Sequence, residues 1–550
     1  MSNSRLKILI STISFIFLMV ISRLFYLQIV IGSQYRTKAL SQTQKLEKIN
    51  THRGTIYDNF GFPLVQNQTT YTLSIYKPNL TLPLDQIISK INSVQPDFES
   101  KFEQLISKFS QNDKQKWISF PQHFDKHQYD LLSDISGIEF SQDQKRFYPE
   151  NQLAKNILGL VAQDSDGKTT GYGGLEGYYN KHLEGRPGYA WQVKDAQGKS
   201  LISLSNWETN PLDGRNLHTT INRDIQYLIE KILKEGVETY NADSGLITIM
   251  QPQTGNIIAM ADYTATQSAT PSATANTAIT SLFEPGSIFK PLVVAMALDK
   301  NAISSDYICH LCDRPLTIGQ YTIENWNQET HPESPLKDII KNSDNIGMSL
   351  IIRQLGLKSF LQYYSLLGLS NKSGIDLQGE SKPISKNIWP EIDLATASFG
   401  QGIAINQIQM LTAFNTLANE GKLVSPKIVR YLSENDQTIV SKKTPSRQVF
   451  KPTTTQTVKE ILKYSVENGS IARLKPKNIE ACAKSGTAQV AVKGGYTDDN
   501  TVASYVGFSP CDTPKFTMII TINRPRTTPW GASSAAPLWY DLAEKLNFIL

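Results

Sequence analysis

The stretch Glu284-Pro285-Gly286-Ser287-Ile288-Phe289-Lys290-Pro291 decides how this 550-residue chain is interpreted. Its proline and glycine are turn residues, and the apolar run Leu292–Met296 that follows predicts a buried helix. A spacing of three places Ser287 and Lys290 on one face of that helix. A serine hydroxyl needs a base to become a nucleophile, and a lysine among apolar neighbours can be neutral and act as that base. The alternative is a structural helix with a chance Ser-x-x-Lys, because this short pattern is common.

Charge and composition limit the classes of function. The chain has 55 basic and 50 acidic residues, a net charge of +5, and these charges are spread without a basic tract that would favour nucleic acid. A hydrophobic content of 40% is enough for sizeable cores. The length predicts about three or four domains.

The N-terminus predicts a membrane anchor. Residues Ile8–Ile31 are uncharged except for Arg23, are mostly apolar, and are long enough to cross a hydrocarbon layer of about 30 Å. Arg23 lies toward one end, where its side chain can reach the interface. No small-x-small cleavage site follows, which favours an uncleaved anchor over a signal peptide. Arg5 and Lys7 predict a cytoplasmic N-terminus and therefore an extracytoplasmic body.

Residues 36–240 consist of short alternating stretches and turns. We find no nucleophile, ligand cluster or phosphate loop in them, which indicates a spacer or an interaction domain. His123 and His127 are four apart on a predicted helix, but no glutamate follows the first, so a solvated face is favoured over a zinc site.

The second half of the chain predicts an antiparallel sheet with helices packed on it, an α+β fold. The expected elements are a hairpin of 245–250 and 257–260, helices at 336–340 and 346–355, strands at 484–490, 503–508 and 516–523 with a turn at 493–495, and a last helix at 538–549.

Three short motifs follow one another in this half: Ser287-x-x-Lys290, Ser343-Asp344-Asn345 and Lys484-Ser485-Gly486. Each is weak alone, but their order and their places at a helix start, an inter-helix loop and a strand match the penicillin-recognising serine acyltransferase set. The third motif has Ser485 where threonine is usual, which keeps the hydroxyl.

The chain resembles a class B penicillin-binding protein, a monofunctional peptidoglycan D,D-transpeptidase, over nearly its whole length. Further similar stretches are Arg53-Gly-Thr-Ile-Tyr-Asp58, Gly174-Leu-Glu176, Glu284-Pro-Gly-Ser287 and Phe399-Gly-Gln-Gly402. The resemblance implies the penicillin-binding transpeptidase fold, an antiparallel sheet flanked by helices with a helical subdomain. It also implies three parts: a tail and transmembrane anchor at 1–35, a β-rich N-terminal pedestal of the dimerisation type at 36–235, and a transpeptidase domain at 240–550.

The resemblance also implies a two-step acyl transfer without metal or cofactor. Ser287 would attack the penultimate D-Ala carbonyl of a stem peptide, and an amine of a second strand would then take the acyl group. The implied catalytic residues are Ser287, Lys290, Ser343, Asn345 and Lys484, and the implied substrate-binding residues are Ser485, Gly486 and Thr487. Lys290 would be the base, and the backbone N–H groups of Ser287 and Thr487 would form the oxyanion hole.

The implied partners are peptidoglycan strands as donor and acceptor, the membrane, a membrane glycosyltransferase with other wall-synthesis and division proteins, and β-lactams as inhibitors. The sequence around Ser287 and Ser343 is more similar to the septal division type, whereas Ser485 points toward the elongation type. Two alternatives remain: a D,D-carboxypeptidase or β-lactamase on the same motifs, and a non-catalytic scaffold of a wall-synthesis complex. A Ser-His-Asp hydrolase is disfavoured, because Ser287 lacks the second glycine of a nucleophile elbow.

Four cysteines remain. Cys309-His-Leu-Cys312 is a possible metal or redox pair, and outside the cytoplasm it could form a disulfide. Zinc would need Cys482 and Cys511 as further ligands, so free thiols or a local disulfide are favoured over metal.

Overall fold

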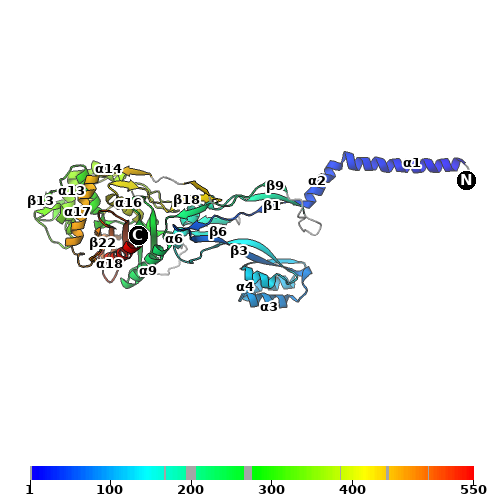
Figure 1. Ribbon diagram of the computed structural model, residues 1–550, viewed down its shortest axis with the longest axis horizontal. Coiled ribbons are helices and arrows are strands. Elements are labelled where there is room, and N and C mark those ends of the chain that lie inside the picture. The colour runs from blue at the N-terminus through cyan, green and yellow to red at the C-terminus, as the bar shows by residue number, and fades with distance from the viewer. Residues whose placement is uncertain are drawn as a thin grey trace. The chain divides into compact units, whose positions relative to one another are not determined.

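The structure is a computed structural model (Figure 1) that describes residues 3–165, 169–193, 206–265, 275–384, 386–435, 437–440, 445–492 and 495–550. The chain forms two compact units. One comprises Met1–Arg53 and Glu184–Gly214, and the other comprises Gly54–Leu183 and Arg215–Leu550.

The first unit begins with the predicted apolar helix. Residues Ser4–Val30 have a mean hydropathy of 2.3 and their side chains are exposed, so this helix is long and apolar enough to cross a membrane. The unit's elements are α1 (Asn3–Phe25), a π-helical turn (Tyr26–Val30), α2 (Gly32–Thr43) and an antiparallel sheet of β1 (Gln44–Ile49), β8 (Gly188–Val193) and β9 (Asn206–Thr209).

The second unit contains a pedestal head, which we define as residues 63–147. Its elements are β3 (Pro63–Tyr76), η2 (Lys77–Asn79), α3 (Leu84–Val94), α4 (Phe98–Gln111), β4 (Trp117–Phe124), α5 (Lys126–Leu132) and β5 (Ile138–Phe147), and α3 and α4 lie beside β3 (Figure 1). The helices bury an aromatic core on the sheet. The predicted helix through His123 and His127 is wrong, because strand alternation places His123 on β4 and the Asp125 capping box starts α5 before His127.

The sheet of the pedestal head continues into strands from both sides of the predicted boundary near residue 235. Its order is β19-β18-β10-β2-β3-β4, with β5 on β3. The added strands are β2 (Ile56–Tyr57), β10 (Asn216–Thr219), β18 (Val429–Glu434) and β19 (Gln437–Val440). Short elements follow β5: α6 (Lys155–Leu158), β6 (Leu160–Gln163), β7 (Thr169–Tyr172), α7 (Gly174–Tyr178) and α8 (Asn180–Leu183).

A buried ion pair connects two of the stretches outside the catalytic motifs on which the family resemblance rests. The Arg146 Nε atom lies 2.7 Å from Glu176 Oε1, and its Nη2 atom donates to the Gly54 carbonyl at 2.6 Å. Because a Cβ on Gly54 would lie 1.8 Å from the Arg215 carbonyl oxygen, only glycine fits there. The Arg53–Asp58 and Gly174–Glu176 stretches thus meet through Arg146.

The predicted antiparallel sheet is confirmed, with strand order β12-β11-β23-β22-β21. The strands are β11 (Ser244–Met250), β12 (Ile257–Thr264), β21 (Cys482–Val492), β22 (Gly495–Ser509) and β23 (Phe516–Asn523). Of the predicted turn at 493–495, residues 493 and 494 lie outside the described residues. Alternating side chains of β11 enter two different cores, Leu246 in one and Ile247 in the other.

Helices cover both faces of this sheet, which confirms the α+β prediction. On one face, α9 (Arg223–Thr239) and α18 (Ala535–Ile549) pack around the buried Trp539. The other face is covered by α16 (Gln407–Ala418), and the helical part beyond it contains α11 (Lys290–Asp299), α12 (Leu336–Lys341), α13 (Asn345–Leu355), α14 (Leu357–Leu366), α15 (Glu391–Ala397) and α17 (Pro452–Asn468) (Figure 1). The predicted helices at 336–340, 346–355 and 538–549 are α12, α13 and α18.

The remaining short elements lie around these helices. They are α10 (Thr277–Thr280), η3 (Gly286–Phe289), β13 (Ile308–Cys309), β14 (Leu316–Ile318), β15 (Tyr321–Ile323), β16 (Ser334–Pro335), β17 (Lys422–Val424) and β20 (Ser446–Gln448). All four cysteines are paired. Cys309 bonds to Cys312, as one of the open alternatives expected, and Cys482 bonds to Cys511, a pair that the sequence did not indicate.

Candidate active site

Ser287 lies in a tight turn that the Phe399–Gly402 stretch holds in place. The turn η3 leads into α11, and Gly286 adopts the left-handed φ of +60°. Gly286 N–H donates to the Gly400 carbonyl at 3.1 Å, and a Cβ on Gly400 would lie 2.3 Å from the Gly286 oxygen, so glycine is required there. Gly402 N–H donates to Glu284 Oε1 at 3.0 Å. These contacts present Ser287 at the start of the helix with its side chain half-buried.

Lys290, three residues further on, is fully buried, and its Nζ atom has three oxygen partners. Its Nζ atom lies 2.6 Å from the Ser343 carbonyl oxygen, 3.1 Å from Ser343 Oγ and 2.8 Å from Asn345 Oδ1. Burial holds the pKa of Lys290 well below its usual value, and the nearby charge of Lys484 lowers this pKa further, whereas Asp344 opposes the shift. A lysine in this setting gives up its proton more readily than a lysine in water.

The Ser343-Asp344-Asn345 turn links α12 to α13. Ser343 has a left-handed φ of +56°, an unusual conformation for a residue with a side chain, and its carbonyl faces Lys290. Asp344 caps α13, because its Oδ1 atom accepts from Gly347 N–H at 2.7 Å. The Asp344 side chain is fully buried.

The third motif lies on the edge strand β21, beside the Ser287 turn. A Cβ on Gly486 would lie 2.9 Å from the Ile288 side chain and 3.2 Å from the Pro285 carbonyl oxygen, so glycine lets the strand approach the turn. Ser485 and Thr487 are half-buried, and the Thr487 hydroxyl accepts from Gly531 N–H at 3.0 Å.

Lys484 lies one residue before this pair. Its Nζ atom donates to the Ser485 carbonyl at 3.0 Å. Burial lowers the pKa of Lys484 to about 8. Lys484 is therefore still mostly a cation at neutral pH and lies close enough to affect Lys290.

The structure brings the three motifs together. Hydrogen bonds join Lys290 to the second motif, and backbone packing joins the Ser287 turn to the third. Within the described part of the chain, the Ser287 hydroxyl has no hydrogen-bond partner. This is compatible with a catalytic role, because catalytic hydrogen bonds often tighten only when substrate binds. The arrangement supplies a nucleophile, a depressed-pKa lysine, and a half-buried hydroxyl pair next to a cation.

The sequence analysis missed three residues that support the motifs: Asn325, His331 and Gly531. Asn325 and His331 contact Asp344, and Gly531 contacts Thr487. They lie in loops 13 or more residues away from the motif residues that they contact and belong to no short pattern. A cluster of asparagines at 325 and 327 among apolar strands was the only local signal of an ordered turn.

Comparison with known proteins agrees with this geometry. Residues 245–544 match the penicillin-binding protein transpeptidase domain family, and residues 48–219 match the penicillin-binding protein dimerisation domain family. Stage V sporulation protein D of Bacillus subtilis (strain 168) is 26% identical over 95% of this chain and 82% of its own. Peptidoglycan D,D-transpeptidase FtsI of Buchnera aphidicola subsp. Baizongia pistaciae (strain Bp) is 26% identical over 99% of this chain and 95% of its own.

A solved structure supports the fold. Penicillin Binding Protein 2X from Streptococcus thermophilus superimposes with a TM-score of 0.76 at 22% identity, over 92% of this chain and 80% of that chain. The transpeptidase match alone spans more than half of the sequence. This chain belongs to the penicillin-binding protein transpeptidase family.

Proposed function

We propose that this protein is a serine D,D-transpeptidase that crosslinks peptidoglycan stem peptides through an acyl-enzyme on Ser287. The family supplies the reaction class, and two curated relatives, one of them FtsI of Escherichia coli (strain K12), are named peptidoglycan D,D-transpeptidases. The observation that supports the residue assignment best is the fully buried Lys290, held by Ser343 and Asn345 and only three residues from Ser287.

The first step forms the acyl-enzyme. Neutral Lys290 accepts the Ser287 proton as the oxygen attacks the penultimate D-Ala carbonyl carbon, and a general base contributes about 10²–10⁴ in rate. The peptide bond to the terminal D-Ala then breaks, and its nitrogen leaves with a proton that passes through Lys290 and Ser343. The backbone N–H groups of Ser287 and Thr487 stabilise the oxyanion.

The second step transfers the acyl group. The amine of a second stem peptide attacks the ester carbon, the Ser287 oxygen leaves and recovers a proton through Lys290, and a new amide forms. The third motif binds the donor earlier, before the terminal D-Ala leaves in the first step. Lys484 then keeps the potential positive where the donor's terminal carboxylate binds. The hydroxyls of Ser485 and Thr487 donate to that carboxylate, and the backbone of Gly486 lets the substrate approach the strand.

The N-terminal segment and the pedestal place this chemistry at the membrane. The apolar helix Ser4–Val30 anchors the chain, with the catalytic domain on the extracytoplasmic side. We propose a division into an anchor at 1–35, a pedestal at 36–235 and a transpeptidase domain at 240–550, and the family matches at 48–219 and 245–544 support the last two parts. A membrane glycosyltransferase that polymerises the glycan is the expected partner.

The cellular role proposed is crosslinking at the division septum, based on the sequence around Ser287 and Ser343. Localising a fluorescently tagged copy in dividing cells tests this part separately. A uniform side-wall distribution would assign the enzyme to elongation.

Two alternatives use the same features differently. A D,D-carboxypeptidase or β-lactamase would pass the acyl group to water, and rapid turnover of bound penicillin would reveal it. A non-catalytic scaffold would use the pedestal alone and would not need a lysine with a depressed pKa beside the serine.

Intact-mass measurement after incubation with penicillin tests the assignment of Ser287. We expect one slowly released adduct on the wild type and none on Ser287→Ala. A wild type without adduct, or an adduct that persists in Ser287→Ala, would contradict the proposal.

A further inference from the structure

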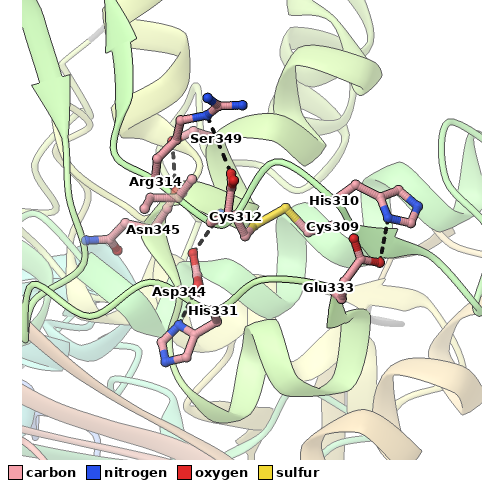
Figure 2. The surroundings of a disulfide bond; sticks show 12 residues. Cys309, His310, Cys312, Arg314, His331, Glu333, Asp344, Asn345 and Ser349 are labelled. Atoms are coloured by element: carbon pink, nitrogen blue, oxygen red, sulfur yellow. Dashed lines mark hydrogen bonds and ion pairs between the residues drawn. A yellow bond between two sulfur atoms is a disulfide. The ribbon is translucent and has the colours of Figure 1, made fainter.

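We propose that Asn325 and His331 are positioning residues for the Ser343-Asp344-Asn345 turn, holding it so that its oxygens meet Lys290. This inference rests on the proposed function, because it concerns the acylation of Ser287. Figure 2 shows His331 next to Asp344 on one side of the Cys309–Cys312 disulfide.

The Asp344 carboxylate is the buried centre of this support. Its Oδ1 atom caps α13, and its Oδ2 atom accepts from His331 Nδ1 at 2.8 Å and from Asn325 Nδ2 at 3.1 Å. With a carboxylate as acceptor, Nδ1 is the ring nitrogen that bears the proton. A buried carboxylate that loses a donor must move toward another or remain unpaired at considerable cost. The position of the turn therefore depends on both donors.

Asn325 also holds the catalytic residue Asn345 directly. The Asn325 Oδ1 atom accepts from Asn345 N–H at 2.6 Å, and Asn325 is only 4% exposed. The Asn345 side chain donates through Nδ2 to the Glu324 carbonyl at 3.0 Å, which turns its Oδ1 atom toward Lys290 at 2.8 Å. The segment 324–331 thus fixes both the backbone and the amide orientation of Asn345.

This supporting segment is itself tied at its far end. His331 N–H donates to the Cys312 carbonyl at 2.9 Å, and Cys312 is fully buried in its disulfide with Cys309. The strand β13, which ends at Cys309, pairs with β16 just after His331. His331 is therefore held by backbone on one side while its ring supports Asp344 on the other.

A second histidine offers a matched control. His310 Nδ1 lies 2.7 Å from Glu333 Oε2, and both side chains are exposed, at 69% and 66% (Figure 2). The pair His331–Asp344 has the same chemistry and nearly the same distance, but with side chains 22% and 0% exposed. Only the buried pair contacts the catalytic turn, so the two histidines separate a positioning role from a general contribution of this region.

The test is a time course of labelling by fluorescent penicillin at several concentrations, with full-length protein in detergent. It separates the saturating acylation rate from the half-saturating concentration. We expect His331→Leu to lower the saturating rate at least about tenfold, as the loss of a hydrogen bond to a buried charge implies. The half-saturating penicillin concentration should stay within about threefold of the wild-type value. The initial, non-covalent binding of penicillin does not depend on the oxygens of the turn that contact Lys290. His331→Asn, whose amide nitrogen can replace Nδ1, should recover most of the rate, and His310→Leu should match the wild type.

Three outcomes would overturn the inference: a wild-type saturating rate in His331→Leu, a His331→Asn variant as slow as His331→Leu, or a reduced labelled fraction that still acylates at the wild-type rate. The last would indicate a purely structural role. If His331→Leu does not fold, Asn325→Ala replaces it, since it removes the donor to Asp344 and the acceptor of the Asn345 N–H without adding a charge. A wild-type rate in Asn325→Ala would equally overturn the inference. A wild type that is not labelled at Ser287 would instead contradict the proposed function.

Discussion

The pedestal head and the catalytic centre are both antiparallel sheets covered by helices, but they bury different chemistry. In the head, Thr70 and Ser74 are buried, the Arg146 side chain is buried against Glu176, and the core is aromatic and aliphatic. The catalytic centre buries Lys290, Lys484 and Asp344. Burying charge is unfavourable unless it is paired. The buried Arg146 side chain of the head is paired with Glu176, whereas Lys290 and Lys484 form no ion pair among the described residues, and this difference marks the functional site.

The largest expected effect is on stability and belongs to the head. Phe120 is 2% exposed and contacts the rings of Phe98 and Phe102 at 5.0 and 5.4 Å. We expect Phe120→Ala to destabilise the head by about 3–5 kcal/mol, as large-to-small core changes do. Thermal unfolding followed by circular dichroism measures the loss. Penicillin acylation at 25 °C should keep its wild-type rate, and a slowed rate would show that the two regions are coupled.

The sequence predicted the catalytic half better than the head, for a physical reason. Hairpin patterns, apolar helical runs and the three motifs are local signals, and they located β11, α13 and β21 within a few residues. Helix α9 also carries local signals, a clear apolar periodicity and the Asn222 cap. In the head, the spacing of His123 and His127 predicts one helix, but the capping box at Asp125 begins a new element between them.

The electrostatic state of the site was only partly predictable. Apolar neighbours in sequence indicated that Lys290 would be desolvated, and its pKa is lowered. Its acceptors, the Ser343 carbonyl and Asn345, lie more than 50 residues away, and no sequence motif links Asn325 or His331 to Asp344. Contacts across long sequence separations arise only from the tertiary fold.

The pH dependence of the acylation rate tests the two buried lysines of the catalytic centre, and we expect an effect of intermediate size. Acylation should rise with pH as Lys290 loses its proton, because its pKa is lowered. It should fall as pH increases through about 8, the pKa of Lys484, because the cation that attracts the substrate carboxylate is then lost. In Lys484→Arg, which stays charged, the decline should disappear while some activity is retained. An unchanged alkaline decline in Lys484→Arg would assign it to another group.

The smallest effect is expected from removing the anchor. A chain truncated to begin at Arg36 lacks the apolar helix Ser4–Val30 and should be soluble without detergent. Its acylation rate by penicillin should lie within about twofold of the full-length rate, since no described hydrogen bond of the catalytic motifs involves residues before 36. Gel-based fluorescent labelling measures both proteins side by side, and a soluble but unlabelled chain would show that the anchor contributes to the site.

The measurement that tests the account most directly is the acylation rate of Lys290→Arg. Arginine keeps the positive charge but is not deprotonated in proteins, so it cannot take the Ser287 proton. The account predicts a rate at least about 10² below wild type, similar to that of Lys290→Ala. Stopped-flow labelling with fluorescent penicillin gives the rates, and thermal unfolding confirms that both variants are folded. A folded Lys290→Arg variant that is acylated within a few-fold of the wild-type rate would contradict the role of Lys290 as the base.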